Sequence, residues 1–327
     1  MILAFALGIL TITNTITVWH IILLGFLLGI VQAVDIPARQ AYVPEMLDEN
    51  KQLLSSAIAL NSTIYNGARV IGPTIAGLLI AFFGLGMAFI FNGISYIAVL
   101  IALYFIKTKA IVPQVHQSAI KAIREGLRYS FSHPTIKSLL IMSAFISMFG
   151  WSYMTLMPVV AHEVFKQNAA GLGYLYAAMG MGALLTTIII SAYSQKIDAY
   201  KYILGQLFIF VVGLFLFSIA PTVILAYVFL FIIGFSLVGL FAMANTTIQH
   251  AVEVNMRGRV MSIYALAFMG TAPLGNFLIG YMADLFGSQM AIRICAIAVF
   301  LYGLYFYKNL GTLQRRQNYY EQRSTAL

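Results

Sequence analysis

The stretch DIPARQAYVPEMLDENKQLLSSAIALNSTIYNGARVIGPTIAGLLIAFFG, residues 35–84, decides the architecture of this chain. Its first part is polar, and from about Ser55 to Phe83 it continues as one helical run of membrane length. A helical wheel places five polar or small side chains on one narrow face: Ser62, Asn66, Arg69, Pro73 and Ala76. Because a charge inside a bilayer is costly and faces protein or water, this face predicts a functional stripe around Arg69. The alternative is that Arg69 only ties down the end of a neighbouring helix.

The composition is that of a membrane protein with several spans. Of the 327 residues, 61% are hydrophobic and 9% are charged, whereas a soluble domain has about 25% charged residues. The one cysteine, Cys295, excludes an internal disulfide framework and a metal site built from several cysteines. The net charge of +9 does not indicate nucleic acid as a partner, because the basic residues are distributed over alternate loops.

No group of residues predicts catalysis or a bound cofactor. The five histidines are scattered without the spacing of metal ligands, and no glycine-rich phosphate loop indicates ATP binding. We therefore expect a protein that is not an enzyme and that holds neither a cofactor nor a metal.

Transmembrane helices require runs of about 20 apolar residues. On that rule the sequence contains about ten spans, the first of them short. The predicted fold class is an all-α polytopic membrane protein. The predicted helices cover residues 1–13, 18–34, 55–83, 86–106, 138–160, 169–193, 202–220, 223–246, 260–286 and 289–307.

The placement of lysine and arginine predicts the orientation, because these residues are enriched in cytoplasmic loops. With Met1 on the cytoplasmic side, sixteen basic residues fall on the inner side and two, Lys166 and Arg293, on the outer side. We therefore expect a multi-pass protein of the plasma (inner) membrane with both termini in the cytoplasm.

The polar interval between Lys107 and Lys137 marks the boundary between two helix bundles. It divides the chain into an incomplete N-terminal bundle (1–107), a cytoplasmic linker (108–136), a C-terminal six-helix bundle (137–310) and a basic cytoplasmic tail (311–327). The linker pattern predicts an amphipathic helix at the inner membrane surface, with an ordinary solvated helix as the alternative. The apolar positions are Ile120, Ile123, Leu127 and Phe131, and the basic ones are Lys121, Arg124 and Arg128.

The two bundles share a faint internal repeat of the kind that builds many transporter folds. Ser62, Arg69, Pro73 and Ala76 are matched two hundred positions later by Ser262, Met269, Pro273 and Asn276. The second helix of this pair is the fifth of six in its bundle, whereas the first is the third of four. The pattern therefore predicts that the first bundle lacks two helices at its start.

Two loop-to-helix segments carry a family resemblance. The first is DIPARQAYVPE at 35–45, continued by Asn61, Asn66, Arg69 and the GPTIAG run at 72–77; the second is RGRVMS at 257–262, with Pro273, Gly275 and Gly280. Both segments resemble the bacterial exporter branch of the major facilitator superfamily, which includes the enterobactin exporter and macrolide efflux proteins. This family has a two-bundle fold of twelve helices, so the resemblance implies that its first two are absent here.

The resemblance implies a secondary active transporter that exports an amphiphilic small molecule, of the drug or siderophore class, by alternating access. The GPTIAG run resembles the antiporter motif of the family, in which small residues and a proline let one helix slide against its neighbours. Protons are a candidate coupling ion, and Asp35 is the candidate carboxylate unless it only pairs with Arg39. The alternative is a truncated, non-transporting membrane protein or a remnant that needs a partner polypeptide.

Polar and aromatic residues on otherwise apolar helices predict a substrate cavity with mostly apolar walls. The residues expected to line it are Asn66, Arg69, Asn92, Tyr96, Ser147 and Trp151. The residues expected to gate it are Asp35, Arg39, Gly72, Pro73, Gly77, Arg257 and Arg259. We expect the two arginines of the second bundle at the inner mouth, where Asp35 or Glu45 from the first bundle would approach them in one state.

Overall fold

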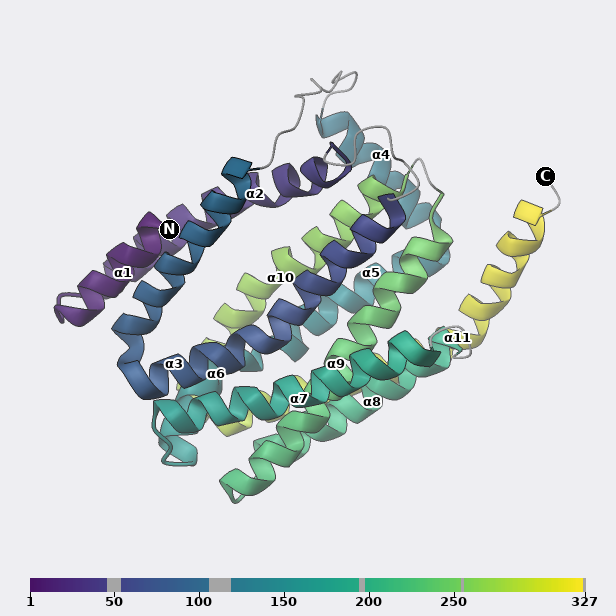
Figure 1. Ribbon diagram of the computed structural model, residues 1–327. Coiled ribbons are helices and arrows are strands. Elements are labelled where there is room, and N and C mark those ends of the chain that lie inside the picture. The colour runs from purple at the N-terminus through teal and green to yellow at the C-terminus, as the bar shows by residue number, and fades with distance from the viewer. Residues whose placement is uncertain (46–53, 106–118, 194–197, 254–255, 326–327) are drawn as a thin grey trace. The chain divides into compact units, whose positions relative to one another are not determined.

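A computed structural model of the chain is all-helical, as the composition predicts, and its described ranges contain no strand (Figure 1). Those ranges are residues 1–45, 54–105, 119–193, 198–253 and 256–325. Most side chains between residues 36 and 81, and those beyond residue 308, lie outside the description. The chain forms two compact units, Met1–Gln114 and Val115–Leu327, so the division lies within the polar interval between the two groups of spans.

Seven helical segments in the described part of the chain can cross a membrane by length and composition. Two shorter apolar helices, Ile2–Ile12 and Val18–Gln32, precede them. These nine, together with the helix that leads up to Gly84, correspond to the ten that the sequence predicts.

The first unit consists of α1 (Ile2–Ile12), α2 (Val18–Glu45) and α3 (Leu54–Phe105). α1 lies against the second part of α3, where Gly8 and Gly86 face each other. A Cβ atom on Gly8 would meet the side chain of Ile90 and the carbonyl oxygen of Gly86. Small residues therefore let these two helices approach at backbone distance, as is common in membranes.

Two glycines with positive φ set the sharpest turns between helices. Gly84, with φ 80° and ψ 166°, interrupts α3 between the two helices that the sequence predicts there. Gly287, with φ 83° and ψ 154°, separates α10 (Arg257–Phe286) from α11 (Ser288–Thr325). Only glycine adopts this region without steric cost. The two turns follow the two helices of the internal repeat, so the repeat extends to the backbone conformation at their ends.

The second unit contains the remaining elements around one apolar core. The long helical segment Pro134–Val164 is built from four consecutive elements with two π-helical stretches. The elements are α4 (Ala119–Ser132), α5 (Pro134–Phe145), η2 (Ile146–Trp151), α6 (Tyr153–Val159), η3 (Val160–Val164), α7 (Ala169–Tyr193), α8 (Ala199–Ser218), α9 (Val223–Ala251), α10 and α11.

The helices α7 and α9 cross with their backbones in contact. A Cβ atom on Gly182 would overlap the carbonyl oxygen of Phe231, and one on Gly234 would overlap the carbonyl oxygen of Met179. Each glycine thus leaves room for the main chain of the opposite helix. α9 also packs against α8, so it lies between α7 and α8 in contact with both (Figure 1).

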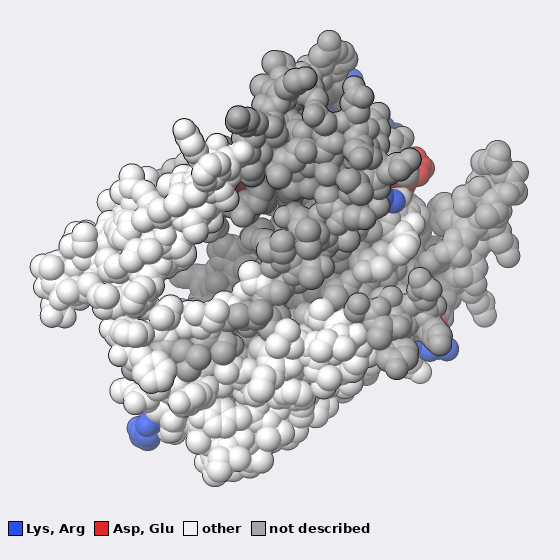
Figure 2. All heavy atoms as spheres, in the orientation of Figure 1, with Lys and Arg blue, Asp and Glu red and all other residues white. Residues whose placement is uncertain are grey.

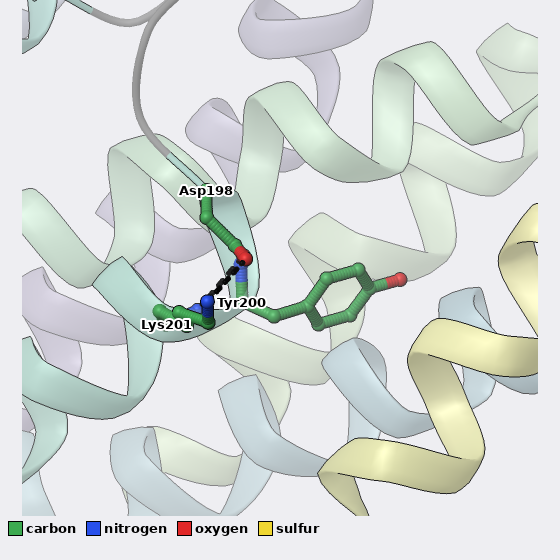
Figure 3. Close-up of polar contacts among 3 residues, drawn as sticks. All are labelled: Asp198, Tyr200 and Lys201. Carbon is green, nitrogen blue, oxygen red and sulfur yellow. Dashed lines mark hydrogen bonds and ion pairs between the residues drawn. The ribbon is translucent and has the colours of Figure 1, made fainter.

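The start of α8 is capped by an aspartate. Asp198 accepts hydrogen bonds from the backbone amides of Tyr200 and Lys201, at 3.1 and 3.2 Å, and the Lys201 ammonium lies 3.6 Å from its carboxylate (Figure 3). Such a cap pairs amides that the helix itself leaves free. The Tyr200 side chain points away from the cap, and its hydroxyl donates to Thr135 Oγ1 at 3.1 Å, which joins α8 to α5.

The described surface is mostly apolar. Trp19 on α2 and Phe277 on α10 are each 78% exposed. On the face shown in Figure 2, charged side chains of the described residues occur in only a few places. A surface of this kind fits contact with lipid rather than with water.

We expect Gly182→Ala to destabilise the second unit by about 1–3 kcal/mol, because the added methyl group must push α7 away from α9. Gly205→Ala on α8 is the matched control, since no atom lies within 4 Å of a Cβ atom there. Thermal unfolding of the two purified variants in detergent measures the difference. Equal midpoints would show that α7 and α9 do not need this contact.

Candidate functional site

Three aromatic rings from three helical segments meet in the second unit. The ring of Trp151 lies edge-on to Phe268, with centroids 5.4 Å apart, and to Phe241, at 6.3 Å. Phe241 and Phe268 are themselves 4.8 Å apart. We call these three residues the aromatic cluster. All three are half-buried and lie near the middle of their spans, the depth at which transporters hold their substrates.

A π-helical stretch positions Trp151. The segment η2 is flanked by α-helix on both sides, and π-helical turns inside α-helices occur frequently at functional sites. Ser147 in η2 is fully buried and donates a hydrogen bond to the carbonyl oxygen of Phe268 at 2.5 Å. This bond ties η2 to α10 one helical turn before Trp151, so Ser147 supports the aromatic cluster and exposes no surface of its own.

Close packing of α10 on η2 keeps the cluster together. A Cβ atom on Gly275 would overlap the carbonyl oxygen of Met148 and the hydroxyl of Ser152. Thr271, one turn before Gly275, donates to the carbonyl oxygen of Ala144 at 3.1 Å. The position of Phe268 relative to Trp151 therefore depends on backbone contacts rather than on long side chains.

A polar stripe continues from the cluster along α9. Asn245 and Gln249 follow Phe241 at intervals of four residues, which places all three on one helical face. The Gln249 amide donates to Asn245 Oδ1 at 2.5 Å. These amides are half-buried in an otherwise apolar helix, so they supply hydrogen-bonding groups beside an aromatic surface.

The stripe ends at a small open pocket of about 150 Å³ between the end of α9 and the start of α10. Its lining residues are Thr246, Gln249, His250 and Arg257. Arg257 is exposed and is the first residue of α10. The helix start adds a partial positive charge to that of the guanidinium, so this pocket favours an anionic group.

Arg259 contacts a carboxylate of the linker helix. Its Nη1 atom lies 2.5 Å from Glu125 Oε2 on α4. Nearby, the backbone amide of Glu253 donates to the Tyr129 hydroxyl at 3.3 Å. These two contacts fasten α4 to the segment that joins α9 and α10.

The other residues predicted for the site are distributed as follows. Asn92 and Tyr96 are exposed and lie one turn apart on α3 of the first unit. Gly72 on α3 and Asp35 on α2 are also exposed. The side chains of five predicted residues lie outside the description: Arg39, Asn66, Arg69, Pro73 and Gly77.

Phe241, Phe268 and Asn245 were not among the site residues predicted from the sequence. One signal for α9 was available, because Phe241, Asn245 and Gln249 recur every four residues in a helix that is otherwise almost wholly apolar. Within the described residues, no group of three histidine, cysteine or acidic side chains is arranged to hold a metal ion.

Comparison with known proteins gives consistent matches. The family described as transmembrane secretion effectors matches residues 1–318. The staphyloferrin A transporter of Staphylococcus aureus is 32% identical over 296 residues, which cover 88% of this chain and 71% of that protein. A multidrug efflux pump of Mycolicibacterium fortuitum is 23% identical over 82% of this chain and 66% of its own length.

The enterobactin exporter of Escherichia coli is 23% identical over 80% of this chain and 62% of its own length. Among solved structures, a bacterial homologue of the human lysosomal transporter Spinster superposes with a TM-score of 0.68 at 14% identity. The match covers 96% of this chain and 81% of the Spinster homologue, whose structure is inward-facing and unoccupied. This likeness concerns the fold.

His133, between α4 and α5, gives the structure a pH dependence. Burial lowers the pKa of its imidazole below the usual 6.5, and the negative charge of Glu253 opposes this by raising it. The folded state therefore binds fewer protons than the unfolded state just below pH 6.5. Stability should be unaffected by His133 above that pH and should fall as the pH drops through 6.5 toward the lowered pKa.

We expect His133→Gln to flatten the pH dependence of the unfolding midpoint below pH 6.5, because glutamine cannot take up the proton. Glu253→Gln should have the opposite effect, since it removes the charge that partly restores the pKa of His133. Thermal unfolding across this pH range tests both. Parallel curves for all three proteins would show that His133 does not contribute.

Proposed function

Because this chain belongs to the transmembrane secretion effector family of the major facilitator superfamily, we propose that it exports an amphiphilic small molecule of the drug or siderophore class by alternating access. The protein is a membrane transporter and not an enzyme. By their names, the three relatives above handle two siderophores and drugs. The alternative of a non-transporting membrane protein is not favoured by these relatives.

The aromatic cluster is the observation that carries this proposal. Three half-buried rings at mid-span, arranged edge to face, offer ring surface to a flat apolar or aromatic part of a ligand. The amides of Asn245 and Gln249 lie on the same face of α9 as Phe241 and supply polar contacts. A mostly apolar wall with a few polar groups suits an amphiphilic organic molecule.

Alternating access requires helices that can shift against each other. Pro273 within α10 supports such movement beside the aromatic cluster, because a proline removes one backbone hydrogen bond of its helix. In the first unit we assign the same role to the GPTIAG run with Gly72, Pro73 and Gly77. In this proposal Asn66, Arg69, Asn92 and Tyr96 contribute to the substrate cavity from the first unit.

In the proposed orientation the protein lies in the inner membrane, and both termini and the linker face the cytoplasm. The pocket beside Arg257 then lies at the inner mouth. There Arg257 and Arg259 act as gating residues, together with Asp35 and Arg39 of the first unit. The contact of Arg259 with Glu125 supports this role, because it places a breakable ion pair at the start of α10. Protons are the proposed coupling ion.

We expect Trp151→Ala to lower export of an amphiphilic fluorescent dye by about tenfold or more, because a central aromatic anchor is lost. Trp19→Ala is the matched control, since this second tryptophan is exposed on α2. Trp151→Phe should retain part of the activity. Efflux from cells that express each variant at equal membrane levels measures the effect, and equal loss in both alanine variants would contradict a substrate role for the aromatic cluster.

We expect Arg69→Leu to insert into the membrane at a normal level and to abolish export. Leucine removes the charge and favours insertion, whereas the guanidinium is suited to bind a carboxylate or an anionic substrate group. Membrane abundance and efflux are measured on the same cells. Export at the unmodified rate would leave Arg69 with a packing role.

A further inference from the structure

The linker helix α4 presents three distinct faces. The first packs on the second unit, where Ser130 is fully buried and a Cβ atom on Gly126 would meet Ile263 and Arg259 of α10. Glu125 and Tyr129 make the polar contacts of this side. This packing fixes how α4 is rotated about its own axis, and therefore what its remaining faces show.

The second face is apolar and exposed. Ile123, Leu127 and Phe131 recur at four-residue spacing and are 55%, 37% and 51% exposed. Among the described residues, the ammonium of Lys137 lies 5.9 Å from the ring centre of Phe131 at the end of this stripe. An exposed apolar stripe on a helix with strong amphipathic character needs an apolar environment.

The third face is basic. Lys121, Arg124 and Arg128 lie side by side around the helix next to the apolar stripe, and all three are exposed. No described residue forms an ion pair with any of them. The acidic residue of α4, Glu125, is engaged with Arg259. The helix therefore presents three cationic side chains that no described acidic side chain neutralises.

The position of α4 in the chain holds both faces at the membrane boundary. The helix ends at Ser132, and the membrane-spanning segment Pro134–Val164 begins two residues later. A helix attached this closely to a span remains at the level of the lipid head groups. An apolar stripe flanked by lysine and arginine is the pattern of helices that lie in this interface.

We propose that α4 binds anionic phospholipids, with Ile123, Leu127 and Phe131 among the acyl chains and Lys121, Arg124 and Arg128 on the phosphate groups. Charge complementarity selects this occupant over a neutral lipid or a solvated helix, because each basic residue near an anionic surface favours binding about fivefold. The site is independent of the exported molecule.

A fluorescent probe on the apolar stripe tests the proposal. In the full chain with Cys295→Ala, Leu127→Cys is labelled with an environment-sensitive nitrobenzoxadiazole and reconstituted into vesicles of phosphatidylcholine, with or without phosphatidylglycerol. Brominated acyl chains should quench this probe, and quenching should increase severalfold with phosphatidylglycerol. Ser132→Cys is the matched control on the exposed polar side of α4, and brominated acyl chains should quench its probe less than the probe at Leu127→Cys in both kinds of vesicle.

Charge variants separate the contribution of the basic face. Replacing Lys121, Arg124 and Arg128 by glutamine should remove the effect of phosphatidylglycerol, whereas Lys121→Arg with Arg124→Lys and Arg128→Lys should keep it. Circular dichroism confirms equal helix content in all variants. Three results would overturn the proposal. The first is a Leu127→Cys probe that reports water in both kinds of vesicle, and the second is equal quenching in both. The third is a probe that reports an apolar environment but is not quenched by brominated lipid, because protein then covers the stripe.

Discussion

Contact between helix backbones is the constraint on which the rest of this structure depends. Inside a bilayer the lipid tails are as apolar as leucine, so burial of apolar side chains does not by itself bring two helices together. In the second unit α7 meets α9 through Gly182 and Gly234, and α10 meets η2 through Gly275. The aromatic cluster follows from the second contact, because Trp151 is carried by η2 and Phe268 by α10. A site of three rings is thus held by positions that have no side chain.

The helices could be predicted from the sequence because a span must satisfy its backbone hydrogen bonds internally, which requires long apolar runs. The turns at Gly84 and Gly287 fall between the predicted helices, where one apolar run ends and the next begins. The π-helical segment η2 was not predictable, since it has no repeating pattern. A wheel of 100° per residue places Ser147 and Trp151 on one face. In the structure Ser147 is fully buried and Trp151 is half-buried, because the wider turn of η2 changes the angle between them.

The site was predicted in part. Trp151 stands out as one of two tryptophans, whereas Phe241 and Phe268 are single rings in helices already rich in apolar residues, and only packing between distant segments joins them. The two arginines at the start of α10 indicated a carboxylate partner, and the described one for Arg259 is Glu125, 134 positions earlier in the linker. Sequence spacing carries no information about such a contact. The linker helix itself could be predicted, because its apolar and basic stripes repeat within one short stretch of sequence.

The single residue between α10 and α11 has a consequence for how this protein is made. Gly287 turns the chain within one residue, so the polar residues next to the turn, Asp284, Ser288 and Gln289, are the ones that can face water at this end of the two helices. So short a connection keeps the end of α10 and the start of α11 together while the chain is being inserted. We therefore expect the two helices to enter the membrane as one helical hairpin, with the apolar surface of both favouring insertion.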